Sequence, residues 1–557
     1  MSIEIQMSRD PSFSIEKAGQ RITVYGSFFE HPNIFEIEKF LHNPSEMDLD
    51  GDYLLITEDT KGGRTLIVRG GYETFPVYSA NHKGSLLLSD DLFSLATKIS
   101  KVSWNLEAVS DYFSPGWNNC QKGNKTPFRE VSKFPAGFYV FSCNNDSEEF
   151  EKIRWKKNNL HQSFKYDSSN LQEFKDAFLS LVRDYMARVE PKNLAFSVSG
   201  GIDSGALAVV ASRLHIGSNL KFFTLSYGGS EDEAQLAKTL DPYLVRPVDV
   251  VVVSQPDSFL MGLRELLLLT QTPYSDIEGL THLEYFRELR SRGVDRLVCG
   301  LGADVVFGGT PYEYPALARD FLFKLRLVDS YRTFTAYLTG TRGHVNGSRI
   351  IFKFIIFSII TIIRELLPDS FRTFLRSALH KKSSYTNFLL NDPRFVASPK
   401  VVTNYSDALS FASGDAAPRQ ISQILRGLGI NPIFPFEGKR FGNLAAECDP
   451  VIFSRYENKY CIRFATRELL PKEILKNKKK FGNAGFEGEL FTKNKYEILS
   501  YIRTARATKK TSIVNIQELE EALTQDIFTD NVFRAINLLL FEDIVREHEI
   551  ELSFCEN

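Results

Sequence analysis

The chain has 557 residues, of which 43% are hydrophobic and 24% are charged. These ordinary values exclude a disordered, collagen-like or acidic-tail protein, and at about 100–200 residues per domain the length predicts two to four domains. Lysine and arginine (67) nearly balance aspartate and glutamate (69), so the net charge of -2 excludes nucleic-acid binding driven by bulk charge. Any nucleotide has to be held by a local site.

Short alternating segments separated by Gly, Asn and Asp turns fill roughly the first 150 residues, at 21–25, 51–56, 65–69 and 85–89. They predict an antiparallel sheet domain. After residue 155 a helical pattern at 169–188 is followed by apolar strands that alternate with helices, at 194–198, 221–225, 248–253 and 296–299. This alternation predicts a parallel sheet with helices on both faces. From about residue 310 the pattern is mostly helical, with a basic insert at about 340–400.

The longest apolar run covers residues 350–363. It is shorter than the ~20 residues that cross a bilayer, so stable membrane insertion is not expected. We expect a buried or lid helix here. Contact with a membrane surface stays open as an alternative, because five cations follow the run, at Arg364, Arg372, Arg376, Lys381 and Lys382.

Six cysteines occur without C-x-x-C spacing or a Cys/His pattern for zinc, and the first residues lack a basic segment followed by an apolar core. We therefore expect a chain that has no signal peptide and resides in a reducing compartment, which predicts a cytoplasmic protein.

The segment from Phe196 to Gly205, Phe-Ser-Val-Ser-Gly-Gly-Ile-Asp-Ser-Gly, ends a strand and opens an apolar helix. Its two adjacent glycines allow backbone N–H groups to approach an anion closely, and its serines supply hydroxyls beside a helix N-terminus. This pattern predicts a phosphate-binding loop. The lysine of a Walker motif is absent, whereas Asp203 beside phosphates is typical of a magnesium ligand. The alternative is a plain Gly-Gly turn with an aspartate helix cap.

Ser-Gly-Gly-Ile-Asp-Ser resembles the pyrophosphatase loop of ligases that convert ATP to AMP, and its context resembles asparagine synthetase. Four later segments resemble that family in order and spacing: residues 230–237, 299–309, 429–436 and 470–481. Residues 51–53, 71–78 and 134–137 resemble its N-terminal amidotransferase-type domain. The resemblance implies an α/β protein with an antiparallel β-sandwich of the Ntn type over residues 1–155. A parallel-sheet, adenine nucleotide α-hydrolase-like ATP pyrophosphatase domain would follow over residues 156–557.

The chemistry that the resemblance implies begins with attack of a substrate carboxylate on the α-phosphorus of ATP, which gives an acyl-adenylate and pyrophosphate. Asp203 and Asp304 would share Mg²⁺, and Lys478 would neutralise charge on the α-phosphate, with Lys479 as the choice if the register shifts by one. The alternative for these lysines is a solvated helix end. ATP contacts are expected at Val198, Ser199, Gly200, Gly201, Ile202, Asp203, Ser204, Ser226, Gly300, Leu301 and Gly302.

Three departures from the family narrow the function. Position 2 is Ser2, where a glutaminase would have its cysteine nucleophile, so we expect no glutaminase activity and a structural or peptide-binding N-terminal domain. β-Lactam synthetases resemble this chain but use a Tyr–Glu pair as base, and Leu301 and Asn431 stand at those positions. Leu301, Asn431 and Val305 together look most like the lasso-peptide macrolactam synthetases, or lasso cyclases.

The resemblance implies closure of an isopeptide bond between the N-terminal amine of a leader-free core peptide and an Asp or Glu side chain. A terminal amine has a pKa of about 7.7–8.0 and is partly neutral, so a weak protein base is tolerable when the amine is held close. A leader peptidase and a leader-binding protein are the other partners expected. The alternatives are a small-molecule amide ligase like a glutaminase-less asparagine synthetase or a β-lactam synthetase, and a non-catalytic peptide-binding protein.

A peptide substrate needs a large pocket, and candidate wall residues lie after the third strand and in later segments. Each has a simpler alternative, in which the tyrosines pack in the core and the histidine is an ordinary helix residue. The candidates are Tyr274, Asp276, Glu278, His282, Tyr312 and Asn431.

Overall fold

A computed structural model of the chain describes its regular elements and most of the turns that join them. No helix among the described residues is long and apolar enough to cross a membrane. The described residues are 2–17, 20–28, 50–59, 65–70, 74–113, 123–136, 138–142, 148–152, 164–189, 191–216, 218–228, 233–253, 258–274, 276–308, 313–342, 347–366, 417–455, 457–477, 486–509 and 512–553.

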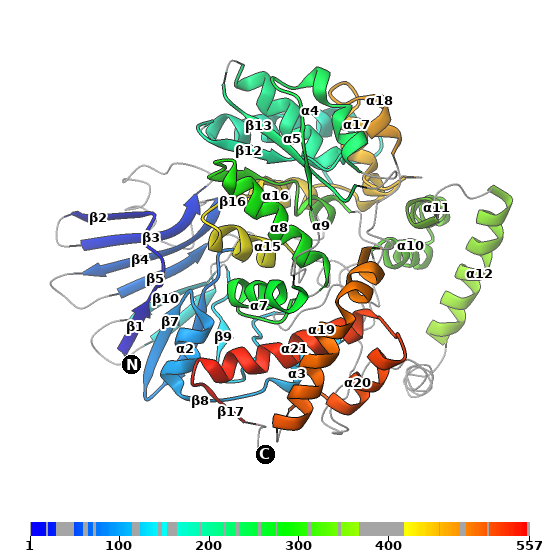
Figure 1. Cartoon of the computed structure of the whole chain (residues 1–557). Helices are drawn as coiled ribbons and strands as arrows, with labels where there is room; N and C mark the ends of the chain where they lie inside the picture. Colours follow the sequence, from blue (N-terminus) through cyan, green and yellow to red (C-terminus); the bar gives the residue numbers. More distant parts are fainter. Residues whose placement is uncertain are drawn as a thin grey trace.

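Two sheets form the N-terminal part (Figure 1). The six-stranded sheet is antiparallel throughout, in the order β11 (Glu148–Lys152), β10 (Phe138–Ser142), β5 (Thr65–Gly70), β4 (Gly51–Asp59), β3 (Gln20–Phe28) and β2 (Phe13–Lys17). The four-stranded sheet has the order β1 (Ser2–Gln6), β7 (Ser85–Ser89), β6 (Tyr78–His82) and β9 (Ser132–Lys133).

One hydrophobic cluster joins these two sheets. Leu54 and Ile67 from the larger sheet lie in the same cluster as Leu86 and Leu88 from the smaller one. The alternation of apolar residues in the predicted strands thus produces two sheets with a shared core, as expected for a sandwich. The parallel pairing of β1 with β7 is the one departure from antiparallel order in these two sheets, among the strands that the structure describes.

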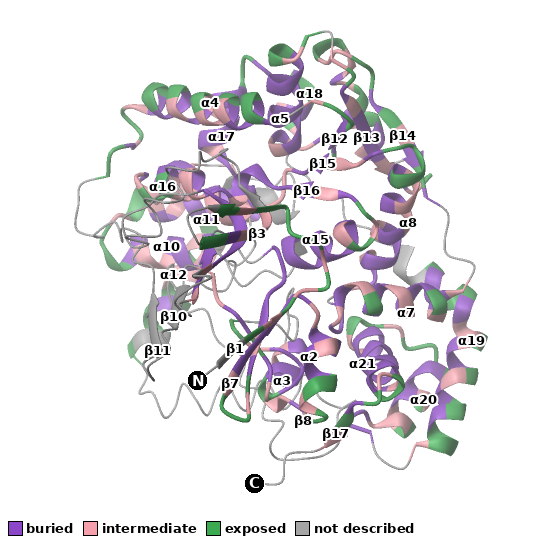
Figure 2. Cartoon of the chain, turned by 90° about the vertical axis from the view of Figure 1, so that its left-hand side faces the viewer, coloured by how far each residue is buried: buried purple, intermediate pink, exposed green. Residues whose placement is uncertain are grey.

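A parallel five-stranded sheet follows, in the order β14 (Asp249–Val252), β13 (Lys221–Ser226), β12 (Leu194–Ser197), β15 (Arg296–Val298) and β16 (Asn431–Ile433). The four strands predicted from residues 194 to 299 are confirmed. The central strands β12 and β15 are largely buried (Figure 2). Helices that accompany the sheet are α4 (Leu171–Arg188), α5 (Ile202–Leu214), α6 (Glu233–Lys238), α7 (Phe259–Thr270), α8 (Glu278–Ser291) and α9 (Ala303–Phe307).

The later part of the chain is mainly helical, as its pattern predicts. It comprises α10 (Glu313–Phe323), α11 (Leu327–Arg342), α12 (Gly347–Leu366), α15 (Ala417–Gly427), α16 (Lys439–Ala446), α17 (Tyr460–Thr466), α18 (Lys472–Lys476), α19 (Phe486–Thr508), α20 (Ile516–Thr524) and α21 (Asp530–Glu547), with the short 3-10 helices η2 (Pro435–Glu437) and η3 (Pro450–Phe453).

Packing crosses the predicted domain boundary near residue 155. Helices α2 (Leu92–Ile99) and α3 (Leu106–Phe113) share one hydrophobic cluster with α7, α8 and α21. Strand β17 (Glu551–Ser553) pairs with β8 (Lys101–Ser103), so the end of the described chain returns to its first quarter. The division into domains at residues 1–155 and 156–557 stays a prediction, and one hydrophobic cluster includes residues from both sides of that boundary.

Candidate functional site

The predicted phosphate-binding loop lies between β12 and α5, at the carboxyl end of the parallel sheet. Gly200 has φ +67°, and a Cβ there would come within 3.0 Å of the Ala237 backbone nitrogen in α6. The Ser199 N–H donates to the Ser204 hydroxyl at 3.2 Å, and the two hydroxyls lie 3.3 Å apart. The loop is thus a tight turn whose conformation and packing both require glycine at position 200.

Helix α5 begins at Ile202, within the predicted loop. Asp203 and Ser204 therefore lie in the first turn of the helix, with Gly201 at the N-cap position and no side chain capping the helix. The first backbone N–H groups of a helix carry partial positive charge and no intrahelical partner, which favours an anion such as phosphate at this end.

The second predicted loop, after β15, lies directly against the first. A Cβ at Gly300 would come within 2.8 Å of the Ser204 backbone nitrogen, so only glycine permits this approach. Gly302 has φ +91° and faces the Glu437 carboxylate, which a Cβ would meet at 2.6 Å. The strand order brings the two loops together because β12 and β15 are hydrogen-bonded neighbours in the sheet.

Asp203 and Asp304, the two predicted magnesium ligands, converge on one cation, Lys459. The Lys459 ammonium makes an ion pair with the Asp203 carboxylate and lies 2.6 Å from Oδ1 of Asp304. Its side chain is only 6% exposed, against 16% for Asp203 and 36% for Asp304. The structure thus brings the two carboxylates to the same lysine, which is buried between them.

Burial opposes the charge on Lys459, but the carboxylates of Asp203 and Asp304 outweigh it and raise the pKa of the lysine above its ordinary value. Lys459 is therefore an ammonium at every physiological pH. Sequence reasoning missed this residue. The sequence offers only a weak signal for it, a lysine in the short segment Asn458-Lys459-Tyr460 with Arg463 about one helical turn later. No neighbouring residue in the sequence indicates that Asp203 and Asp304 are the partners of Lys459.

The chemistry of this pair of carboxylates fits Mg²⁺. In nucleotide sites that ion is held by one or two carboxylates, while phosphate oxygens and waters complete its octahedron. Asp203 and Asp304 would hold it. Bound there, Mg²⁺ would supply positive charge against the phosphates of ATP.

The buried residue Tyr314 helps to position Lys459. Lys459 has φ +53° and stands just before α17, where its backbone N–H donates to the Tyr314 hydroxyl at 3.2 Å. Tyr314 is itself buried and donates to the Phe453 carbonyl at 3.5 Å. A left-handed lysine is uncommon, so the tyrosine hydroxyl helps to hold a conformation that aims the ammonium at the two carboxylates.

Arg463 holds the segment that leads to Lys478. Its guanidinium donates to the carbonyls of Leu475 at 2.7 Å and Asn477 at 3.0 Å, and its Nε donates to the Asn458 carbonyl at 2.9 Å. One buried side chain thereby ties the residue before Lys459 to the residue before Lys478. Lys478 and Lys479 themselves lie outside the described residues.

The remaining predicted ATP contacts lie at the same end of the sheet. Val198 donates its N–H to the Phe223 carbonyl at 2.8 Å, which fixes the loop against β13. Ser226 ends β13, and its hydroxyl accepts from the Gly228 N–H at 3.1 Å. Leu301 packs against the large hydrophobic cluster. A leucine side chain provides no proton acceptor in this loop.

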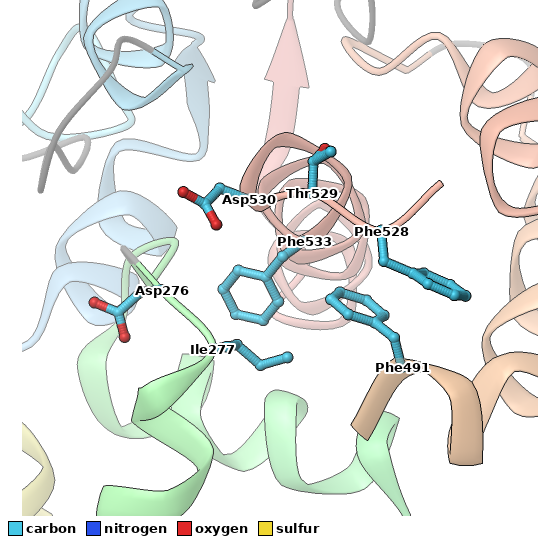
Figure 3. A pocket seen from close by; sticks show the side chains of 7 residues that line it. All are labelled: Asp276, Ile277, Phe491, Phe528, Thr529, Asp530 and Phe533. Carbon is cyan, nitrogen blue, oxygen red and sulfur yellow. The ribbon is translucent and has the colours of Figure 1, made fainter. Parts of the chain in front are cut away.

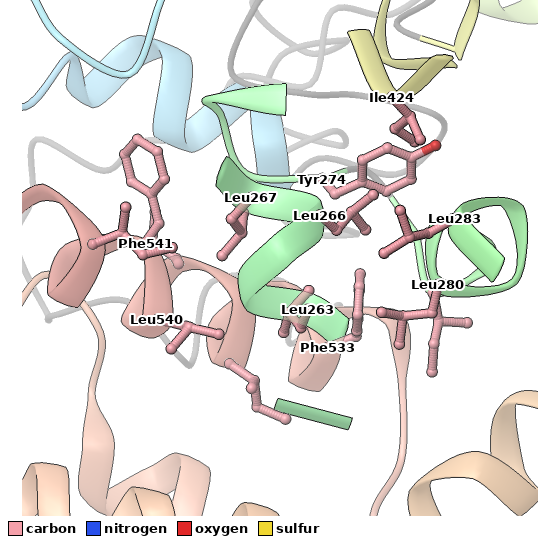
Figure 4. Close-up of a cluster of buried hydrophobic side chains, with 14 of the residues drawn as sticks. Leu263, Leu266, Leu267, Tyr274, Leu280, Leu283, Ile424, Phe533, Leu540 and Phe541 are labelled. Atoms are coloured by element: carbon pink, nitrogen blue, oxygen red, sulfur yellow. The ribbon is translucent and has the colours of Figure 1, made fainter. Parts of the chain in front are cut away.

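The candidate pocket residues are not gathered in one place. Tyr274 is buried in the core beside Leu266, Leu283 and Ile424, which favours the packing alternative (Figure 4). Its carbonyl accepts from the Tyr112 hydroxyl at 2.8 Å. Its role is thus to join α3 to the segment after α7.

Asp276 lines a small cavity of about 120 Å³ with aromatic walls (Figure 3). Phe491, Phe528 and Phe533 form those walls, and Asp530 stands at the rim. None of the residues of the two loops lines this cavity. A cavity of this size takes a few non-hydrogen atoms, far fewer than a folded peptide has.

His282 and Glu278 belong to α8. Glu278 is in its first turn, a usual place for a carboxylate. Burial lowers the pKa of His282 to about 4, and its ring stacks on Phe286 with centroids 6.0 Å apart. Its Nδ1 has no hydrogen-bond partner among the described residues. The imidazole is therefore neutral at physiological pH.

Asn431 starts β16 and pairs with Arg296, at the amino end of the sheet. The nucleotide loops leave the opposite end, so the structure does not place Asn431 beside them. Its carboxamide oxygen lies 3.5 Å from the Arg426 guanidinium. Tyr312, the last candidate, lies outside the described residues.

Comparisons with known proteins agree with this geometry. The family model described as asparagine synthase matches residues 173–542, about two thirds of the chain. Two curated relatives, Amidase chry2 of Gibberella zeae and Amidase chyE of Penicillium rubens, are 22% and 23% identical over 292 residues. In each case the match covers 49% of this chain and 41% of the relative, so less than half of each relative's length is represented.

The matched region contains both loops, Asp203, Asp304 and Lys459. Members of this family are ATP-dependent ligases that form C–N bonds, which the two adjoining glycine-rich loops and the paired carboxylates suit. The chain belongs to the asparagine synthase family.

Proposed function

We propose that this protein is an ATP-dependent lasso-peptide cyclase. It adenylates an Asp or Glu side chain of a leader-free core peptide and then forms an isopeptide bond with the N-terminal amine of the same peptide, releasing AMP and pyrophosphate. The observation that carries the ATP half of this proposal is the convergence of Asp203 and Asp304 on Lys459 beside the two glycine-rich loops.

In the proposed first step, ATP lies with its phosphates over residues 199–204, where backbone N–H groups of α5 and the Ser199 and Ser204 hydroxyls donate to them. Asp203 and Asp304 would hold Mg²⁺, which would supply positive charge against the phosphates. Lys459 stays close enough to keep the two carboxylates in place. Lys478 comes directly after the segment held by Arg463, and its proposed role is to neutralise charge on the α-phosphate.

The proposed second step needs an amine that is already a nucleophile. Leu301 and Asn431 supply no base, and the neutral His282 belongs to a helix that contributes to neither loop. A peptide N-terminal amine has a pKa of about 7.7–8.0 and is partly neutral without help. Tethering it to the activated carboxyl raises its effective concentration, so proximity replaces general-base catalysis.

The decisive test incubates the chain with Mg²⁺–ATP and synthetic core peptides that carry a free N-terminus and an Asp or Glu several residues later. Mass spectrometry should find loss of one water from the peptide, with one AMP formed per ring closed. N-acetylated peptides serve as the matched control, because they can be adenylated but cannot close.

Parallel reactions test the other functions. Aspartate with ammonium and ATP should give no asparagine; if it does, the protein is a small-molecule amide ligase and the cyclase proposal is wrong. The relatives' name denotes amide cleavage, so peptide amides are also incubated without ATP. Hydrolysis there, with no AMP formed in any ATP reaction, would contradict a ligase.

A further inference from the structure

Helix α12 (Gly347–Leu366) has two apolar faces, and only one of them is covered. Ile350 is buried on the inner face, where Phe354 and Phe357 pack against Phe334 of α11 with ring centroids 5.7 and 4.7 Å apart. The helix therefore needs its inner face for folding. The outer face has no such role.

Nine apolar side chains of α12 are 39–79% exposed. At 3.6 residues per turn their positions fill one continuous arc of about 180°. We predicted a buried or lid helix here, and burial is wrong for this half of α12. Among these residues are Ile351, Phe352, Ile355, Ile359, Ile363 and Leu366.

Cations border this exposed arc on one side. Arg349 and Lys353 lie about one helical turn apart at the edge of the arc. The only acidic residue of the helix is Glu365. The sequence immediately after the arc, residues 364–382, contains five lysines and arginines against two carboxylates. The charge around the arc is therefore positive, although the whole chain carries -2.

Two features determine which partner suits the exposed arc. A second helix would cover only a narrow stripe of two residues per seven, whereas this arc is half of the helix circumference, the width that a planar apolar phase covers. The cationic border complements anionic headgroups. Figure 1 shows α12 at the edge of the molecule, beyond α10 and α11, where a flat surface can approach it.

We propose that α12 docks the protein on an anionic lipid bilayer, with the exposed arc in the headgroup region and Arg349 and Lys353 at the lipid phosphates. The helix lies in the plane of the membrane surface and does not cross it. This inference is independent of the proposed reaction, because none of the residues in the arc belongs to the nucleotide loops.

The test is co-sedimentation of the full chain with two kinds of vesicle, pure phosphatidylcholine and phosphatidylcholine with about one third phosphatidylglycerol. We expect binding to the anionic vesicles that weakens as salt is added. The triple variant Ile355→Gln/Ile359→Gln/Ile363→Gln should reduce binding at least about ten-fold. The control is Ile216→Gln/Val252→Gln/Met261→Gln, which removes three apolar side chains elsewhere that are even more exposed and should bind as the natural chain does.

The variant Arg349→Gln/Lys353→Gln should lose the preference for anionic vesicles. All variants should keep the unfolding temperature of the natural chain, since the changed side chains are outside the core. Failure of the natural chain to bind either vesicle would overturn the proposal. So would loss of binding in the control triple, because binding would then be non-specific.

Two further outcomes identify another occupant of the arc, and each overturns the proposal. The first is found by light scattering after gel filtration, where we expect a monomer. A dimer that the Ile355→Gln/Ile359→Gln/Ile363→Gln variant converts to a monomer would assign the arc to a second copy. The second is found by labelling the Ile359→Cys variant with a water-soluble maleimide. After the labelling of the natural cysteines is subtracted, the introduced cysteine should react fast. Slow labelling would mean that residues 367–416 of this chain cover the arc.

Discussion

The Lys459 ammonium lies 2.6 Å from Oδ1 of Asp304 and pairs with Asp203 as well, although these residues come from three separate segments of the chain. A single lysine thereby offsets part of the charge of two carboxylates beside the nucleotide loops and reduces their mutual repulsion. Four of the predictions below follow from this cluster and from the arginine that supports it.

Replacing Lys459 by methionine should destabilise the protein and make it dependent on magnesium. Two facing carboxylates would lose their shared cation, at a cost of about 2–4 kcal/mol given the partial exposure of Asp304. Mg²⁺ should raise the unfolding temperature of Lys459→Met more than that of the natural chain, and EDTA should remove the difference. Lys472→Met, at an exposed lysine of α18, is the control. Equal magnesium responses would show that Asp203 and Asp304 do not hold the ion.

Replacing Asp203 by asparagine should lower the rate of ATP-dependent AMP formation by about 100-fold or more, because one of the two proposed magnesium ligands is lost. A 100-fold lower rate corresponds to an activation free energy that is higher by about 2.8 kcal/mol. Circular dichroism should be unchanged. Asp249→Asn, at an exposed aspartate of β14, should retain normal activity. Near-normal AMP formation by Asp203→Asn would remove this residue from the site.

Replacing Arg463 by lysine should loosen the segment before Lys478 without touching nucleotide. Lysine cannot span the carbonyls of Asn458, Leu475 and Asn477 together, and losing these charged hydrogen bonds should cost roughly 2–3 kcal/mol. Hydrogen–deuterium exchange at residues 475–477 should rise, and kcat should fall with little change in the KM for ATP. A purely structural role would lower stability and leave kcat of the folded fraction unchanged.

Alanine at Lys478 should abolish AMP formation, whereas alanine at Lys479 should leave most of it. Both lysines follow the segment that Arg463 holds, and the expected difference rests on which side chain neutralises the α-phosphate. Steady-state AMP release by the two variants, at matched unfolding temperatures, makes the comparison. The opposite result would move the register by one residue, and two fully active variants would contradict a role for either lysine.

Stability should depend on pH through His282. Its pKa is about 4 in the folded protein and 6.5 ordinarily, so between these values the unfolded chain binds more protons than the native one. The contribution of neutral His282 to the free energy of unfolding is therefore fully present above pH 6.5. It is lost as the pH drops toward 4, and the free energy of unfolding falls by up to about 3 kcal/mol. His282→Phe keeps the ring stacked on Phe286 and removes this contribution. Urea unfolding from pH 4 to 7 should show a smaller decline for the variant than for the natural chain.

The parts of the site that the sequence predicts are local. The loop at 199–204 shows itself because strand, glycine turn and helix follow one another within ten residues, and the same holds for the loop after β15. Lys459 could not be predicted in this way, since Asp203 lies 256 positions earlier. Helix α12 was ambiguous for another reason: an apolar pattern on every side is shared by buried helices and by helices that face lipid, and only packing distinguishes them.

Pairing of β17 with β8 has a consequence for synthesis on the ribosome. Helices α2 and α3 are made long before α21 and β17, the helix and strand that complete their core. The apolar side chains of α2 and α3 that pack against α21 therefore stay uncovered until that helix has been made. Apolar surface that stays exposed during synthesis favours aggregation.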